Sequence, residues 1–281
     1  MRRKLIGIVI AGTVSAAIAA TGAQAATGGR AVTSRPGAVI VRDILIPVAG
    51  QPSVPAYVVR PAGALAPHSE AGILWLHWLG QIHSDRTEFL PEAVQLASHG
   101  VVSVLPEGTF PWQAAPVGTS ADVTAVENQL AAFRTCLDRL TTRRSIDPSR
   151  IAIVGHDYGA MYGALLADED PQVSAAVLAT PDATWGHWFV KYWLGYTGGQ
   201  AKSYEALFDG LQPVEHVSRL GARELFQWAG KDIYVSAGVR QRFAAAAPQA
   251  KVDLYPDADH QLTDAAIADR DAFLEQVLAL P

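Results

Sequence analysis

The sequence has 281 residues, a formal net charge of −5 and 17% charged residues. This length accommodates one domain with a full hydrophobic core. The negative charge, without a lysine or arginine run in the mature chain, argues against nucleic-acid binding, because a polyanion is neutralised by basic side chains. The single cysteine, Cys136, excludes a disulfide within the chain, and zinc-type spacing is absent, so we expect no metal and no cofactor.

The first residues have the pattern of a secretory signal. Met1-Arg2-Arg3-Lys4 is followed by an apolar stretch over 5–20 and by the small-residue site Ala23-Gln24-Ala25. We therefore expect a signal peptide over 1–25, export by the Sec or Tat route, and a secreted mature domain over 26–281. Removing 1–25 takes away three positive charges and no negative one, which changes the formal net charge from −5 to −8. We expect no membrane span after cleavage, because no other run is long and apolar enough. The sequence leaves the oligomeric state open.

The mature chain alternates predicted strands with predicted helices. Residues 38–48 and 53–60 form a predicted hairpin around a Gly-Gln-Pro turn. Further strands are predicted at 72–77, 101–105, 151–154, 173–179, 224–229 and 251–255, and helices at 85–98, 121–143, 158–167, 237–246 and 262–279. This order predicts an α/β fold: a mostly parallel sheet with an N-terminal antiparallel hairpin and helices on both faces.

Residues 181–218 interrupt that alternation and are unusually aromatic. Insertions at the carboxyl edge of a parallel sheet often cover a ligand site, so we predict a short lid-like insertion. Trp188, Tyr192 and Tyr196 are its candidate substrate-binding residues. The alternative is a helix that packs its aromatic side chains into the core.

The segment Gly155-His156-Asp157-Tyr158-Gly159 directly follows the apolar strand 151–154. In a nucleophile elbow, the central residue lies on a sharp turn between a strand and a helix, and the residues two positions away must be small. Gly155 and Gly159 satisfy that requirement. The segment therefore predicts an elbow whose central residue is Asp157 instead of the usual serine.

Five stretches of this sequence resemble the dienelactone hydrolase family of the α/β-hydrolase superfamily. They are VRDILIPV, GILWLHWLG, IDPSRIAIVGHDYGAMYGALLA, ELFQWAGKDIYV and LYPDADHQLTD. The resemblance extends over nearly the whole mature chain and implies an α/β-hydrolase fold. In that family the nucleophile is Cys or Ser, so Asp157 is a departure. An elbow Asp followed by an aromatic residue is closer to epoxide hydrolases and haloalkane dehalogenases.

The expected partners of Asp157 follow in the chain order nucleophile, acid, histidine. Asp232 follows the strand 224–229 and His260 follows the strand 251–255, so both lie on loops at the carboxyl edge. We predict Asp157, His260 and Asp232 as a catalytic triad. Asp182, after the strand 173–179, is the alternative acid.

We predict an oxyanion hole formed by the backbone N–H groups of Tyr158 and, by resemblance, Leu79. Trp78 replaces the glycine that is usual there, and it is a candidate pocket wall or simply a core residue. His156 is expected to be packed and hydrogen-bonded, not catalytic. Glu107 is expected to be a structural loop carboxylate, and Cys136 a small core residue.

A carboxylate nucleophile displaces a leaving group at saturated carbon and forms an ester with the enzyme, which His260 then hydrolyses through water. The sequence therefore predicts a hydrolase that opens an epoxide in a small hydrophobic substrate, with Tyr158, Tyr192 or Tyr196 protonating the departing oxygen. Four alternatives stay open. They are a haloalkane-type dehalogenase, an ester or lactone hydrolase of the dienelactone hydrolase type, acyl hydrolysis in which His260 activates water directly, and a non-catalytic hydrolase-fold protein that binds a hydrophobic ligand.

Overall fold

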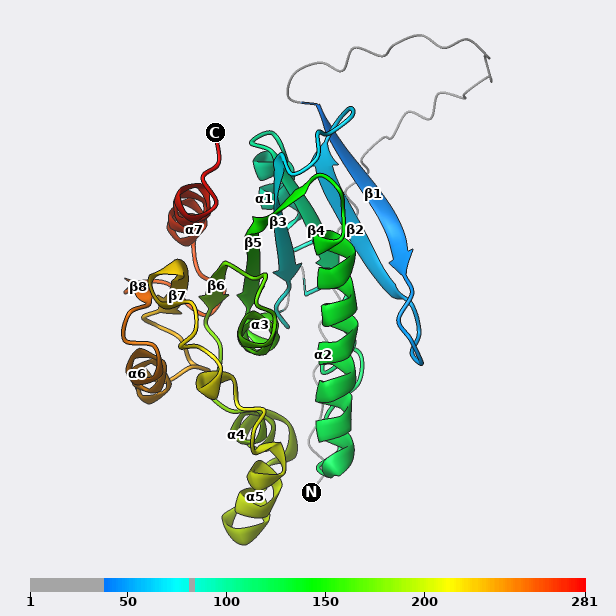
Figure 1. Cartoon of the computed structure of the whole chain (residues 1–281). Coiled ribbons are helices and arrows are strands. Elements are labelled where there is room, and N and C mark those ends of the chain that lie inside the picture. Colours follow the sequence, from blue (N-terminus) through cyan, green and yellow to red (C-terminus); the bar gives the residue numbers. More distant parts are fainter. Residues whose placement is uncertain (1–37, 81–83) are drawn as a thin grey trace, which may run out of the picture. The chain divides into compact units, whose positions relative to one another are not determined.

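The computed structural model describes residues 38–80 and 84–281. The predicted signal peptide and its cleavage site lie outside this range. The described residues form one eight-stranded sheet in the order β1-β2-β4-β3-β5-β6-β7-β8 (Figure 1). The strands are β1 (Val39–Ile46), β2 (Val54–Pro61), β3 (Glu70–Leu76), β4 (Val101–Pro106), β5 (Ile146–His156), β6 (Ala175–Ala179), β7 (Glu224–Ala229) and β8 (Lys251–Tyr255).

The sheet is mixed in the way the sequence predicts. β1 pairs antiparallel with β2, and β2 pairs antiparallel with β4. Every other pair of neighbours is parallel. The predicted hairpin and the mostly parallel sheet are confirmed. Because the central strands are parallel, their carboxyl ends meet at one edge.

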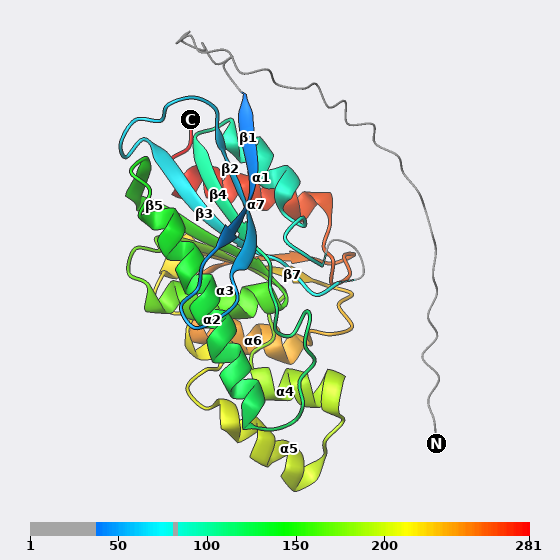
Figure 2. The same cartoon turned by 90° about the vertical axis from the view of Figure 1, so that its right-hand side faces the viewer.

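Two hydrophobic cores cover the two faces of the sheet. The helices are α1 (Leu90–Ala97), α2 (Ser120–Thr141), α3 (Tyr158–Glu169), α4 (Trp185–Phe189), α5 (Gly198–Glu205), α6 (Ala237–Ala246) and α7 (Asp264–Val277). Side chains of α1 and α7 pack in one core, and those of α2, α3 and α6 in the other. Figure 2 shows α1 and α7 together on one face, with α2 and α3 on the other. Cys136 is fully buried in the second core, as expected.

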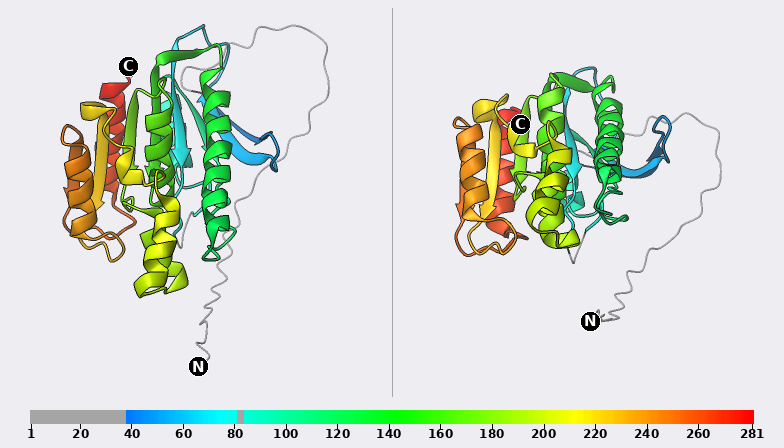
Figure 3. Two further views of the ribbon diagram at one scale, coloured as in Figure 1. Left: turned by 60° about the horizontal axis from the view of Figure 1, so that its bottom comes forward. Right: turned by 90° about the horizontal axis from the view of Figure 1, so that it is seen from below.

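The segment 181–218 folds as a series of short helices beyond the carboxyl ends of the central strands (Figures 1 and 3). α4 continues into a π-helix over Val190–Leu194, and α5 is followed by short 3-10 turns at Ala206–Phe208 and Pro213–Glu215. Trp185 and Phe189 are fully buried. Part of the aromatic content of this segment therefore packs into the core, which was the alternative interpretation.

Element boundaries differ from the predicted ones at local turns. The predicted helix 85–98 begins only at Leu90, because Asp85 accepts hydrogen bonds from the backbone and hydroxyl of Thr87 and forms a turn. α2 begins at Ser120, one residue before the predicted start, and Thr119 is its N-cap because its hydroxyl accepts from the N–H of Ala121. None of the helices in 38–80 and 84–281 combines the length and apolarity needed to cross a membrane.

Glu224 is a buried carboxyl at the start of β7, and it predicts a pH-dependent stability. Burial raises its pKa to about 8, and its Oε2 has no hydrogen-bond partner among the described residues. Because the unfolded chain releases this proton at a lower pH than the folded chain, the free energy of unfolding falls as the pH rises from about 4.5 to about 8. We expect Glu224→Gln to stabilise the protein by about 2 kcal/mol near pH 8 and by almost nothing near pH 4.

Urea denaturation at both pH values measures this difference. Glu127→Gln, at an exposed position of α2, is the matched control and is expected to change neither value. An equal effect of Glu224→Gln at the two pH values would contradict the assignment.

Candidate active site

Asp157 lies at a tight turn between β5 and α3. Its backbone adopts φ 55° and ψ −120°, a conformation that non-glycine residues rarely adopt. A Cβ at Gly155 would collide with the backbone of Gly159, and a Cβ at Gly159 would collide with the carbonyl of Leu76. The two glycines therefore permit the turn, and the segment has the geometry of the predicted elbow.

Asp157, His260 and Asp232 come together at the carboxyl edge of the sheet. His260 Nε2 lies 3.6 Å from Asp157 Oδ1, and its Nδ1 lies 2.8 Å from Asp232 Oδ2. Asp232 is held in place because its Oδ1 accepts from the backbone N–H groups of Tyr234 and Val235. Asp157 and His260 are 2% and 7% exposed, so the charges interact in a nearly dry environment.

This environment changes the protonation of the histidine. Burial alone would lower the pKa of His260, but its interactions with Asp157 and Asp232 outweigh burial and raise the pKa to about 9. For Asp232, burial would raise the pKa, but the bond from His260 and the two backbone N–H groups lower it overall. At neutral pH, His260 is therefore an imidazolium between two carboxylates.

Removing one of these carboxylates tests the assignment without any substrate. We expect Asp232→Asn to lower the pKa of His260 by one unit or more, roughly 1.4 kcal/mol, because the imidazolium loses a charged partner. Histidine-detected NMR titration measures this pKa. Asp182→Asn is the matched control and should leave it unchanged. A His260 pKa that is the same in wild type and Asp232→Asn would refute the pairing.

Asp182, the alternative acid, has another partner. Its Oδ1 accepts from the backbone N–H of Thr184, and burial raises its pKa. The ion pairs of His260 are with Asp157 and Asp232. This geometry favours Asp232 over Asp182 as the orienting acid.

The predicted oxyanion loop holds Asp157 itself. The backbone N–H of Leu79 donates to Asp157 Oδ2 at 3.1 Å. The other oxygen, Oδ1, is buried and has no hydrogen-bond partner among the described residues. Tyr158 is the first residue of α3, so its backbone N–H has no acceptor within the helix. This N–H lies at the N-terminus of α3, which is the positive end of the helix dipole. The carboxylate is thus anchored through one oxygen, and the other faces His260.

Aromatic rings surround His260. Trp188 is 4% exposed, and the centre of its ring lies 6.2 Å from that of His260. Tyr234, which the sequence interpretation missed, lies 5.1 Å from His260 and is 40% exposed. Tyr192 packs on both Trp188 and Tyr234. Tyr196 packs instead on Tyr204. Substrate contact by Trp188 and Tyr192 is compatible with these positions and stays a prediction.

The hydroxyl groups of the predicted acids have defined partners. Tyr192 donates to the carbonyl of Tyr234 at 2.8 Å, and Tyr196 donates to the carbonyl of Gly118 at 3.4 Å. The Tyr158 hydroxyl accepts from Trp193 Nε1 at 2.7 Å, and burial raises its pKa well above the usual value. Of the three hydroxyls, only that of Tyr158 donates no hydrogen bond to another described residue.

His156 and Glu88 connect the loops behind the site. His156 donates from Nε2 to the carbonyl of His260 at 2.9 Å, and its Nδ1 lies 2.7 Å from Glu88 Oε1. Glu88 Oε2 accepts from the N–H of Trp78 at 2.6 Å. His156 is therefore packed and hydrogen-bonded, as expected. The sequence did not predict this role of Glu88. Glu88 lies in the predicted helix 85–98, and nothing around it in the sequence indicates a bond to a distant histidine.

Trp78 and Glu107 contact other residues of the protein through ring stacking and hydrogen bonds. The indole of Trp78 stacks on His156 with ring centres 4.9 Å apart, and its carbonyl accepts from Trp112 Nε1. Trp78 also borders a cavity of about 180 Å³ with Glu88, His156 and residues of the α7 end. Glu107 accepts from the backbone N–H of Arg86, which agrees with a structural loop carboxylate.

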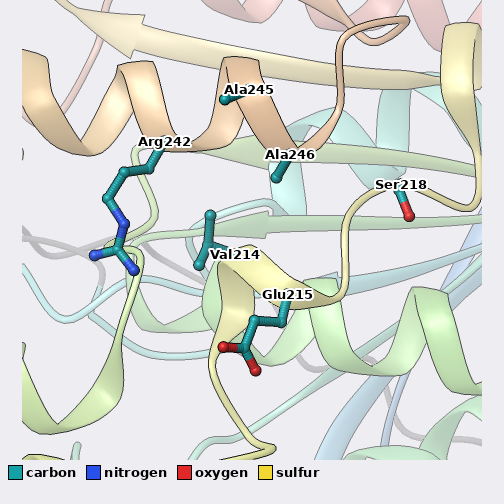
Figure 4. A pocket seen from close by; sticks show the side chains of 6 residues that line it. All are labelled: Val214, Glu215, Ser218, Arg242, Ala245 and Ala246. Carbon is teal, nitrogen blue, oxygen red and sulfur yellow. The ribbon is translucent and has the colours of Figure 1, made fainter.

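A second, larger cavity of about 580 Å³ lies between the 3-10 turn Pro213–Glu215 and α6 (Figure 4). It is lined by Val214, Glu215, Ser218, Arg242, Ala245 and Ala246. Neither cavity is lined by Asp157 or His260. Within 38–80 and 84–281, no group of three or more His, Cys, Asp or Glu side chains has the arrangement of a metal site.

Comparisons with known proteins bear on this architecture. No protein-family profile and no curated protein sequence matches the chain. An acetyl xylan esterase from Paenibacillus sp. R4 has 17% identity and a TM-score of 0.68 over 85% of this chain and 84% of its own. A Klebsiella pneumoniae protein assigned as a dienelactone hydrolase has 17% identity and a TM-score of 0.60 over 86% of this chain and 99% of its own. The chain has the α/β-hydrolase fold.

A third match to this fold is a thermophilic esterase from the Planctomycetes species Thermogutta terrifontis. It has 15% identity and a TM-score of 0.62 over 84% of this chain and 92% of its own. The predicted fold class is confirmed, and dienelactone hydrolases and esterases are among its structural neighbours. These three neighbours are named for ester or lactone chemistry and none for epoxide opening. At such identities the likeness establishes the fold and leaves the reaction to the site.

Proposed function

We propose that this protein is a hydrolase in which Asp157 attacks the substrate and His260 acts first as acid and then as base. The observation that carries the proposal is the position of the Asp157 carboxylate. Its Oδ2 is bound by the N–H of Leu79. Its Oδ1 accepts no hydrogen bond from the described residues and faces His260 Nε2 at 3.6 Å in an ion pair. A carboxylate with one oxygen held by a backbone N–H and the other without a hydrogen bond is oriented for nucleophilic attack.

For the substrate, we propose a small ester or lactone. Oδ1 attacks the carbonyl carbon of the ester. The alkoxide then leaves from that same carbon, so it lies beside His260 Nε2. The imidazolium gives its proton to this alkoxide, and a mixed anhydride with Asp157 is formed. Neutral His260 then takes a proton from water, and the resulting hydroxide cleaves the anhydride to release the acid and restore Asp157. The names of the structural neighbours support this substrate class.

Epoxide opening, the reaction predicted from the sequence, is the second candidate. The position of Asp157 Oδ2 favours it, because the N–H of Leu79 already stabilises the oxygen that becomes negative when water attacks an aspartyl ester. In-line displacement, however, releases its leaving oxygen on the side of the carbon opposite to Asp157, away from His260. Of the predicted acids only Tyr158 has a proton for that oxygen. The comparisons also favour the ester or lactone.

A substrate panel in heavy-oxygen water separates these reactions. p-Nitrophenyl acetate and small lactones test the first candidate, and styrene oxide and 1-bromobutane test displacement at saturated carbon. Displacement must place solvent oxygen in the peptide that contains Asp157, because water attacks the enzyme ester. We expect turnover of the ester or lactone group. If no compound turns over, yet hydrophobic ligands bind wild type and Asp157→Asn equally, the protein is a non-catalytic binder and the proposal is wrong.

A further inference from the structure

A cluster of arginines lies at the opposite end of the sheet from Asp157. Arg42 on β1 is directly opposite Val58 on β2, so Arg42 and Arg60 are diagonal neighbours on one face of the hairpin. That face is the one that packs on α2, because Ile44, Ile46 and Val58 belong to the same core as α2. The last turn of α2 carries Arg139, and the turn that follows carries Arg143 and Arg144. In Figure 1 this end of α2 is its upper end, which lies toward the same end of the sheet at which β2 ends.

These guanidinium groups repel one another. Burial lowers the pKa of Arg143, and the charges of Arg60, Arg139 and Arg42 lower it further. The Nε of Arg143 is buried without a hydrogen-bond partner among the described residues. Arg60 is fixed in place because it donates to the carbonyls of Pro61 and Gly63. The cluster is therefore a partly preorganised concentration of positive charge.

No described carboxylate forms an ion pair with this cluster. Within 38–80 and 84–281, none of Arg42, Arg60, Arg139, Arg143 and Arg144 forms an ion pair with a carboxylate. The remaining residues, 1–37 and 81–83, contain no aspartate or glutamate in their sequence. Elsewhere in the described residues, Arg134 pairs with Glu169 and Arg86 pairs with Asp43. Arg150, Arg219 and Arg223 instead donate to backbone carbonyls, so they too lack a carboxylate partner. What distinguishes the cluster is that Arg42, Arg60, Arg139 and Arg143 are close enough for their charges to act on one another.

We propose that Arg42, Arg60, Arg139 and Arg143 form a binding site for a polyvalent phosphate, a ligand with two or more adjacent phosphate groups. Guanidinium groups bind phosphate oxygens through paired, charge-assisted hydrogen bonds. One phosphate carries at most two negative charges at neutral pH, so several arginines on one surface fit adjacent phosphates better than a single one. The site is separate from Asp157 and does not depend on the proposed hydrolase activity.

Inorganic tripolyphosphate is the probe, measured by calorimetry and thermal shift at about 0.15 M salt, where distant surface charges are screened. We expect saturable binding and a rise in Tm for the wild type. Arg60→Gln with Arg143→Gln should weaken the affinity at least tenfold. The matched control, Arg134→Gln with Arg242→Gln, removes the same charge elsewhere and should change the affinity less than twofold. Arg143→Lys keeps the charge without the guanidinium geometry and should weaken binding at least threefold, which retains a test if the double variant does not fold.

Three results would overturn the proposal. The first is no saturable binding by the wild type at this salt concentration, which would mean that the arginines attract anions only diffusely and form no site. The second is an equal loss of affinity in the control double variant. The third is binding of citrate as tight as that of tripolyphosphate, which would mean that the site does not select phosphate.

Discussion

Asp157→Asn is expected to reduce hydrolysis of the best ester or lactone substrate by at least about 1000-fold, because an amide oxygen is a far weaker nucleophile than a carboxylate. The amide has nearly the same size and can still accept from the N–H of Leu79, so the fold should be retained. Steady-state kcat/KM measures the loss, and circular dichroism checks the fold.

Asp182→Asn is the matched control for this loss, since Asp182 is also buried at the carboxyl edge but bonds to Thr184. Its kcat/KM should stay within about threefold of wild type. Equal activity of wild type and Asp157→Asn would remove Asp157 from the chemistry and favour His260 acting on water alone.

His260→Gln is expected to reduce kcat by at least about 1000-fold, because the leaving group loses its acid and water loses its base. For an activated ester such as p-nitrophenyl acetate, hydrolysis of the anhydride should be slowed more than its formation, because p-nitrophenolate leaves without protonation. A burst of p-nitrophenolate followed by a slow phase is therefore expected in stopped-flow measurements. A variant that keeps a wild-type steady-state rate would contradict any role for His260.

The pH dependence of the wild type separates two roles for His260. In the proposed mechanism the free enzyme needs the protonated form, so kcat/KM for an ester with a poor leaving group should fall as the pH rises above about 9, the pKa of His260. If His260 activated water directly in the first step, kcat/KM would instead rise up to that pH. The sign of the slope near pH 9 decides between them.

The predicted strands and the elbow are correct because their signals are local. Apolar runs bounded by turns specify β3, β5 and β7, and Gly155 and Gly159 specify the turn at Asp157. The convergence of Asp232 and His260 on Asp157 follows from strand order, since parallel strands gather their carboxyl ends. The family resemblance supplied that order.

Other features depend on contacts between distant segments and have no local signal. The tyrosines of 181–218 were interpreted as acids, but Tyr192 and Tyr196 donate to carbonyls of loops that lie elsewhere in the sequence. Glu88 bonds across 68 positions to His156. The arginine cluster is also invisible in the sequence, because a hairpin register and a helix end bring together residues from three separate segments.

The central claim is that Asp157 forms a covalent bond with the substrate. The most direct measurement is the mass of the peptide that contains Asp157, taken from His260→Gln enzyme mixed with p-nitrophenyl acetate and quenched in acid during the burst. The mechanism predicts a peptide heavier by one acetyl group, with the modification on Asp157 and none in an Asp157→Asn, His260→Gln double variant. An unmodified Asp157 peptide in enzyme that has released a full equivalent of p-nitrophenolate would contradict it.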